Sequence, residues 1–324
     1  MKIIPKHTTK LLLAASIGTL VACGGSTSGN ASGETGHFSL AVTDAPIDSA
    51  THVVVEFTGV SIKPADGEAI VFEFDEPKSI DLLALQGSAS ESLLTNEEVP
   101  AGQYNWIRLH VNAEHDGVLD SYIELETGNQ LELRVPSGSQ SGLKLVSGFA
   151  VNAGASADFT IDFDLRKSIV LPPGLSGAML KPALRLVDNT VSGSIAGSVD
   201  AELITARCED PANESGAVYV FSGADASVSD VSGSDNDPLI TALVNHDGNE
   251  YRYEVGFLAE GDYTLSYTCD ARLDDPEAED DLTFVGTANA SVEAGAETEL
   301  NFTVESEETE EDEETEEGDE SSEE

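Results

Sequence analysis

The sequence is short of cysteine, of basic residues and of aromatic residues, and each shortage excludes a class of protein. Three Cys in 324 residues are too few for a small scaffold built on disulfides. Only 15 Lys and Arg stand against 61 Asp and Glu, so the formal net charge is -46. Long-range repulsion of that size opposes nucleic acid as a partner. Aromatic residues make up 6% of the chain, but hydrophobic residues make up 40%, which is enough for real cores.

General catalytic motifs are also missing. The sequence contains no G-x-S-x-G, H-E-x-x-H, phosphate-binding loop or dinucleotide fingerprint. We therefore expect a protein that is not an enzyme and holds no cofactor, with a hydrolase that uses an unrecognised carboxylate pair as an alternative. Acidic stretches at residues 235–237 and 274–281 leave weak Ca²⁺ binding open, although a solvated loop is the favoured interpretation because neither has EF-hand spacing.

The N-terminus has the pattern of an export signal. Three lysines in the first ten residues precede an apolar run at residues 11–22, which is too short to span a bilayer. The segment from Leu20 to Cys23 resembles the bacterial lipobox, whose cysteine is lipidated. The resemblance implies a lipoprotein signal peptide at residues 1–22 and a diacylglycerol and palmitate anchor at Cys23. Because residue 24 is Gly and not Asp, analogy with Gram-negative sorting predicts a lipid-anchored protein of the outer membrane, with the side it faces left open.

Two low-complexity segments flank the rest of the chain. Residues 23–36 are rich in Gly and Ser and are predicted to be a flexible tether. Residues 305–324 contain fourteen acidic and no basic residues, so self-repulsion predicts a disordered acidic tail. Solubility is the favoured role of the tail, and attraction of divalent ions or cationic partners is the alternative.

Between these segments, short runs of alternating apolar and polar residues predict a mainly β protein. Runs such as residues 51–57, 106–112 and 157–165 are separated by turn signals, the pattern of a β-sandwich. We expect two β-sandwich domains, Ig-like or prealbumin-like, at residues 37–190 and 193–304. The only helical segments expected are residues 80–85 and a turn near residues 92–96.

Two cysteines remain if Cys23 is lipidated. In an oxidising compartment, Cys208 and Cys269 are expected to form a disulfide, and two buried free thiols are the alternative.

The strand that follows Gly102 offers the clearest candidate ligand surface. Strict alternation would place Ile107, Leu109 and Val111 in the core. The opposite face, which could stack on and hydrogen-bond a sugar or peptide, would carry Tyr104, Trp106, Arg108, His110 and Asn112. The favoured alternative is a solvated face on which Arg108 pairs with Glu124 or Glu126 across a hairpin.

Several motifs in the first half occur together and in order. They include Thr43-Asp44-Ala45-Pro46, Ile80-Asp81-Leu82-Leu83, Ala101-Gly102-Gln103-Tyr104 and Gly142-Leu143-Lys144-Leu145. Over residues 36–188 the chain thereby resembles the DUF4382 family, a domain of unknown function found in bacterial lipoproteins. The resemblance implies an exported β-sandwich and brings no catalytic residues. The second half looks like a carboxypeptidase-regulatory-like or prealbumin-like sandwich.

Together these features predict a binding, adhesion or envelope-interaction module. Its expected partners are the membrane, through the lipid on Cys23, and an unidentified envelope protein or extracellular glycan. A carbohydrate-binding module that uses the face from Tyr104 to Asn112 is the alternative.

Overall fold

The computed structural model describes residues 33–45, 47, 50–136, 142–172, 177–181, 183–211 and 214–304. The predictions for the signal peptide, for Cys23, for most of the tether and for the acidic tail lie outside these residues. Residues from Glu34 onward form one compact unit. Within the described part of the chain, no helix is both long and apolar enough to cross a membrane.

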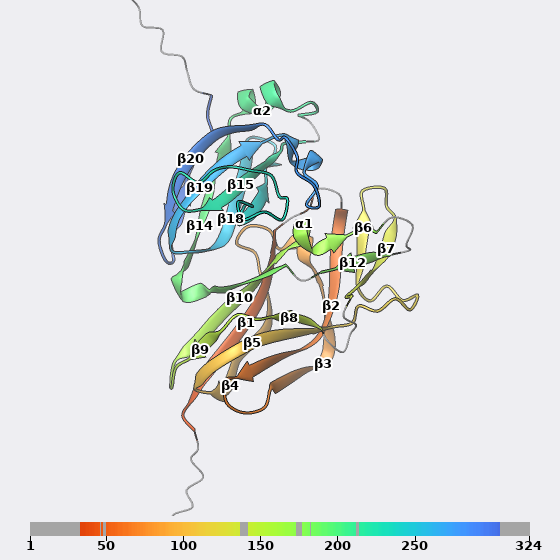
Figure 1. The fold of residues 1–324 in the computed structure, drawn as a ribbon, viewed down its shortest axis with the longest axis vertical. Helices are drawn as coiled ribbons and strands as arrows, with labels where there is room; N and C mark the ends of the chain where they lie inside the picture. Colours follow the sequence, from red (N-terminus) through yellow and green to blue (C-terminus); the bar gives the residue numbers. More distant parts are fainter. Residues whose placement is uncertain are drawn as a thin grey trace, which may run out of the picture. The chain divides into compact units, whose positions relative to one another are not determined.

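The first half is a β-sandwich, in agreement with the predicted fold class (Figure 1). One sheet has the order β13-β10-β1-β4. The other has the order β11-β12-β7-β6-β2-β5-β8, with β3 added to β2 and β9 added to β5. The bounds are β1 (Thr35–Ala45), β2 (Ala50–Pro64), β3 (Ile70–Asp81), β4 (Glu91–Pro100), β5 (Gly102–Val111), β6 (Tyr122–Leu125), β7 (Gln130–Arg134), β8 (Leu143–Leu145), β9 (Phe149–Val151), β10 (Ser156–Asp164), β11 (Ile169–Val170), β12 (Ala178–Leu180) and β13 (Leu184–Asp188).

Alternate residues of these strands build one apolar core. Phe38, Leu40 and Val42 of β1 are fully buried, as are Ile107 and Leu109 of β5. Successive side chains of a strand point to opposite faces, so each sheet contributes one face to this core and leaves the other outside.

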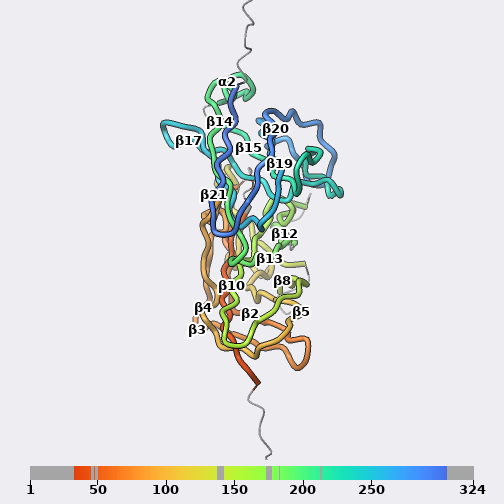
Figure 2. The backbone as a smooth tube through the Cα atoms, turned by 90° about the vertical axis from the view of Figure 1, so that its left-hand side faces the viewer, coloured from red at the N-terminus to blue at the C-terminus, as the bar shows by residue number. Residues whose placement is uncertain are grey.

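The second half is again a pair of sheets, with orders β17-β18-β14-β21 and β16-β15-β19-β20. Strands β14 and β21 pair in parallel and run side by side in Figure 2. The bounds are β14 (Ser192–Val199), β15 (Ala217–Ser222), β16 (Ile240–Leu243), β17 (Asn245–His246), β18 (Tyr251–Ala259), β19 (Gly261–Thr268), β20 (Phe284–Val292) and β21 (Glu297–Glu299). The predicted division into two domains stays a prediction, because the described residues from Glu34 onward belong to one unit.

Helices are short and differ from those predicted. Residues 80–85 contain only the 3₁₀ turn η1 (Leu82–Ala84), and residues 92–96 belong to β4. Four further elements were not predicted: α1 (Leu165–Ser168), α2 (Ala201–Arg207) and the 3₁₀ turns η2 (Asn189–Val191) and η3 (Asp270–Leu273). Each α-helix begins after an aspartate whose side chain accepts a backbone N–H, so capping and not amphipathic periodicity selects these turns.

The predicted disulfide is present. Cys208, which ends α2, is bonded to Cys269 after β19, 61 residues further on. The Tyr267 hydroxyl lies 3.0 Å from Cys269 Sγ and also contacts the carbonyl of Ser215. The bond therefore ties a helix of the second half to the end of a core strand.

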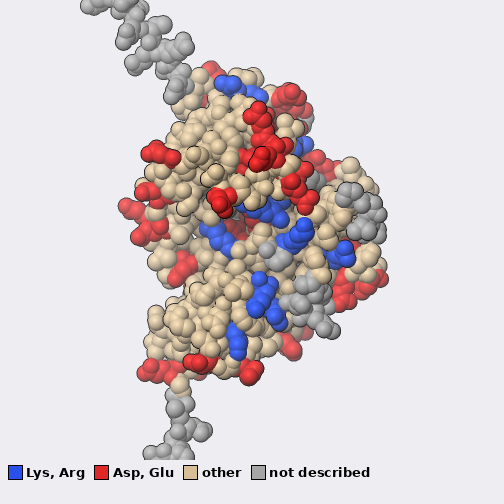
Figure 3. All heavy atoms as spheres, viewed as in Figure 1, with Lys and Arg blue, Asp and Glu red and all other residues tan. Residues whose placement is uncertain are grey.

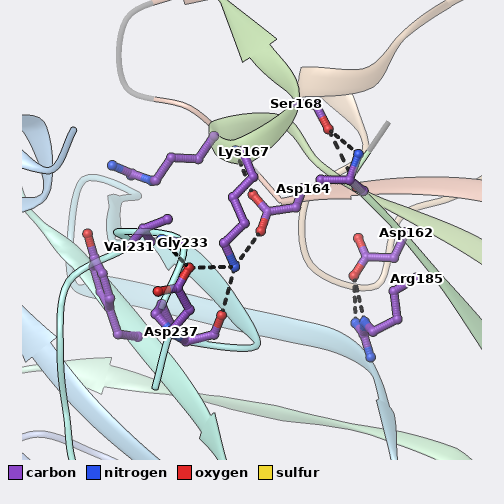
Figure 4. Close-up of polar contacts among 12 residues, drawn as sticks. Asp162, Asp164, Lys167, Ser168, Arg185, Val231, Gly233 and Asp237 are labelled. Carbon is purple, nitrogen blue, oxygen red and sulfur yellow. Dashed lines mark hydrogen bonds and ion pairs between the residues drawn. The ribbon is translucent and has the colours of Figure 1, made fainter. Parts of the chain in front are cut away.

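Basic side chains connect the two halves (Figure 4). Arg185 of β13 binds the buried Asp162 carboxylate at 2.5 Å and donates to the carbonyl of Phe257 at 2.9 Å. Lys167 of α1 pairs with Asp164 at 3.1 Å and donates to the carbonyl of Pro238 at 3.0 Å. The junction is thus held by directional polar contacts, which specify an orientation more than apolar packing does.

Replacing Arg185 with Ala is expected to destabilise the protein by roughly 3 kcal/mol, because a buried carboxylate loses its cation. Urea unfolding followed by circular dichroism measures the change. The matched control is Lys181→Ala, which breaks an exposed pair with Glu277 and should cost about 0.5 kcal/mol or less. Equal effects of the two substitutions would contradict the role given to Arg185.

Candidate functional site

The predicted ligand strand is β5, and most of its alternation holds. Ile107, Leu109 and Val111 are buried in the core, as predicted. Trp106, Arg108 and His110 point outward and are partly exposed. The local pattern therefore placed these three side chains on one outer face.

Tyr104 does not belong to that face, and this part of the prediction is wrong. Its side chain is 2% exposed, stacks on Phe149 with ring centres 4.8 Å apart and donates its hydroxyl to the carbonyl of Pro100. The cause is a shift in register: Lys63 of β2 faces Trp106, but the next residue, Pro64, faces Tyr104. The extra residue between them, Asn105, inverts the alternation and turns Tyr104 into the core.

Asn112 lies just beyond β5 and serves the loop that follows. Its amide nitrogen donates to Glu56 at 3.0 Å and to Asp120 at 2.9 Å. These bonds fix the start of the connection from β5 to β6, and they leave Asn112 fewer groups to offer a ligand.

Trp106 is covered by cations from two strands. The guanidinium carbon of Arg108 lies 5.0 Å from the indole centre and Lys144 Nζ lies 4.8 Å from it, both within cation–π range. Lys63 faces Trp106 across β2, and Ser61 faces Arg108. We call the surface formed by Ser61, Lys63, Trp106, Arg108, His110 and Lys144 the β5 face. Figure 3 shows Lys and Arg side chains over β5 and β8 on one side of the molecule.

The predicted ion pair of Arg108 with Glu124 or Glu126 is wrong. Strand β6, which carries Glu124, pairs with β2 and β7 and not with β5. Glu124 instead accepts from Gln130, and Glu126 pairs with Arg272. Within the residues that the structure describes, Lys63, Arg108 and Lys144 form no ion pair, and the buried Arg108 Nε has no hydrogen-bond acceptor.

His110 and Ser61 form the polar edge of the β5 face. His110 Nε2 lies 2.6 Å from Ser61 Oγ. Burial lowers the pKa of His110, the nearby Arg108 lowers it further and Glu73 partly opposes both, so the imidazole is neutral at pH 7. A serine nucleophile has to reach its substrate, but Ser61 is only 3% exposed. The hydrogen bond with Ser61 is therefore suited to orienting the His110 imidazole, and Ser61 is not placed to act as a nucleophile.

Two carboxyls that the sequence did not single out, Asp44 and Asp162, line a cleft of about 370 Å³. Burial raises the pKa of Asp44 well above its usual value, and Asp162, Asp164 and Asp81 raise it further, whereas the Leu165 N–H lowers it. Among the described residues no donor reaches either Asp44 oxygen at hydrogen-bond geometry. The family motif contains Asp44, but nothing local in the sequence marks it as buried.

Asp44 and Asp162 are not opposite each other in the register of β1 and β10. Asp44 is in register with the core residue Phe163, whereas Asp162 is in register with Thr43. Paired residues of adjacent strands share a face, so Asp44 follows the alternation of the core residue Phe163 and Asp162 follows that of Thr43. The alternative of a hydrolase with an unrecognised carboxylate pair stays a prediction.

The predicted acidic stretches take two different forms. Asp237 accepts hydrogen bonds from Ser232, Gly233 and Ser234; burial alone would raise its pKa, but these bonds lower it overall. Asp274 and Asp280 meet Asp230, with carboxylate oxygens within 4.8 Å of one another. Tyr219 and the Val231 N–H already donate to Asp274. Weak Ca²⁺ binding by these loops stays a prediction.

The fold is that of a β-sandwich protein, and the outer surface of one sheet carries the β5 face. Residues 35–182 match the model of the family described as "Domain of unknown function (DUF4382)". The match agrees with the resemblance that the ordered motifs predicted over residues 36–188. No curated protein matches the sequence.

Solved structures show only distant likeness. A leucine-rich repeat protein from Bacteroides thetaiotaomicron has 12% identity and a TM-score of 0.19, and the match covers 84% of this chain and 26% of that one. The TIE protein of Bacillus anthracis has 9% identity and a TM-score of 0.18, with 83% and 34% covered. The chain thus spans about a third or less of the length of these two proteins. The minor pilin GBS52 of Streptococcus agalactiae has 9% identity and a TM-score of 0.19, with 82% and 94% covered. Scores this low carry no argument about function.

Tyr104→Ala is expected to cost about 3–5 kcal/mol of stability, because it opens a cavity beside Phe149. Trp106→Ala on the outer face should cost about 1 kcal/mol. Guanidinium unfolding followed by far-ultraviolet circular dichroism measures both. If Trp106→Ala proved the more damaging, the inward orientation of Tyr104 would be wrong.

Proposed function

We propose that this protein is a non-enzymatic adhesion module, anchored to the outer membrane by lipid on Cys23, that binds a glycan through the β5 face. The observation that carries the proposal is the surroundings of Trp106. It is the only Trp of the chain, it is partly exposed on an outer sheet surface, and two cations lie over its ring.

The construction of the β5 face supports a binding role. Its side chains come from β2, β5 and β8, which are central or adjacent strands of one sheet, so the backbone holds them in place. Val71 on the neighbouring β3 is 53% exposed and adds apolar surface beside Ser61. Hydrogen-bond donors beside apolar carbon match the hydroxyl groups and the C–H groups of a sugar ring.

The predicted anchor supports a role at the cell envelope. A lipid on Cys23 would hold the chain at the membrane, and the Gly- and Ser-rich residues 23–36 would let it extend. The net negative charge would keep the folded part away from anionic head groups.

A glycan array probed with the full chain tests the binding function. We expect Trp106→Ala to lower the affinity for bound glycans at least tenfold, because the indole organises the face. The matched control is Phe74→Ala on β3, where Lys78 Nζ lies 5.1 Å from the ring centre in a comparable cation–aromatic pair. Unchanged glycan binding by Trp106→Ala would rule out the β5 face as the site.

Mass spectrometry of the N-terminal peptide, paired with protease treatment of whole cells, tests the anchor. We expect lipid on Cys23 and loss of the protein from intact cells, since adhesion requires exposure at the surface. A lipidated but protected protein would favour a periplasmic partner over adhesion. An unmodified Cys23 would contradict the lipoprotein prediction.

A further inference from the structure

We infer that the glycan bound by the β5 face contains acidic sugars, and that Arg108 and Lys144 bind their carboxylates. This inference rests on the proposed function and adds the chemical class of the ligand. It is argued from the lack of described carboxylate partners for these cations and from their positions beside Trp106.

The distribution of ion pairs is the first argument. Without the three lysines of the predicted signal peptide, 12 Lys and Arg face 61 acidic residues. Six of the 12 form ion pairs with described carboxylates, namely Arg166, Lys167, Lys181, Arg185, Arg252 and Arg272. Three of the remaining six belong to the β5 face: Arg108 and Lys144 lie over the Trp106 ring, and Lys63 is opposite Trp106 in the sheet. In so acidic a chain, a cluster of cations without a described carboxylate partner is complementary to an external anion.

The register of β5 and β8 is the second argument. Arg108 and Lys144 are directly opposite each other across the two strands. Like charges in that position repel and destabilise a sheet. The indole ring partly offsets the repulsion by holding both cations against its π-system. A carboxylate between the two cations would remove the repulsion, so the arrangement is more favourable with an anion bound.

The third argument is that two cations already lie over the Trp106 indole ring. A neutral sugar that stacked on Trp106 would compete with cations already 5.0 Å and 4.8 Å from the ring centre. A carboxylate could instead bind to Arg108 and Lys144 while both remain over the ring. The guanidinium of Arg108 also offers a planar fork that matches a carboxylate, which an ammonium does not.

Net charge limits how acidic the ligand can be. A dense polyanion such as nucleic acid is repelled by the whole protein. Charges farther apart than about 8 Å are largely screened at physiological salt, so an isolated carboxylate on a mostly neutral chain responds mainly to the nearest cations. The structure therefore favours a polysaccharide in which uronic acid residues alternate with neutral sugars.

Matched pairs of probes test the inference. Oligosaccharides that contain glucuronate, galacturonate or mannuronate are compared with their carboxyl-reduced counterparts, which keep the sugar rings and lose the charge. Isothermal titration of the full chain should show at least tenfold tighter binding of one or more acidic forms. Arg108→Gln and Lys144→Gln should remove that preference, whereas Lys78→Gln should keep it. Unchanged unfolding midpoints of the variants exclude loss of folding as the cause.

The outcomes separate the two proposals. Equal binding of acidic and reduced forms, or array binding confined to neutral glycans, would overturn the inference and leave glycan adhesion standing. Binding to no glycan in either assay would overturn both. A charge preference that survives Arg108→Gln and Lys144→Gln would place the acidic site elsewhere on the protein.

Discussion

The alternation of side chains along β5 is the constraint on which the candidate site depends. One face of the sheet has to close the core of the first sandwich, so Ile107 and Leu109 point inward and Trp106 and Arg108 point outward. Because of the shift of one residue at Asn105, Tyr104 is buried and Trp106 remains on the outer face. Because this shift buries Tyr104 against Phe149, the core and the β5 face are two consequences of the same register.

Scarce positive charge is used in two different ways along this chain. At the junction between the sandwiches, Arg185 and Lys167 are bound to carboxylates and to backbone carbonyls of the other half. On the β5 face, Arg108 and Lys144 have an aromatic ring instead of a carboxylate. The first arrangement pairs each of the two cations with a carboxylate within the protein, which suits a structural role. The second leaves Arg108 and Lys144 without a described carboxylate partner, as a site for an anionic ligand would require.

Several predictions from the sequence succeeded because the signals were local. The β class followed from period-two runs, and the pairing of Cys208 with Cys269 followed from their being the two cysteines left after Cys23. The errors arose where long-range pairing overrode local pattern. The proposed partners of Arg108, Glu124 and Glu126, lie near it in sequence order, but β2 separates β5 from β6 in the sheet. The helical expectation at residues 92–96 failed because β1 offered strand pairing along that segment.

The sequence by itself determined the mainly β class, the match of residues 35–182 to the DUF4382 model and the sharing of one outer face by Trp106, Arg108 and His110. Each of these depends on residue order or on alternation over a few positions. Only the tertiary structure decided that Tyr104 turns inward and that Lys63 and Lys144 come to lie beside Trp106. The physical reason is that strand order and register minimise the free energy of a whole sandwich, summed over contacts between residues far apart in the chain, so no short segment encodes them.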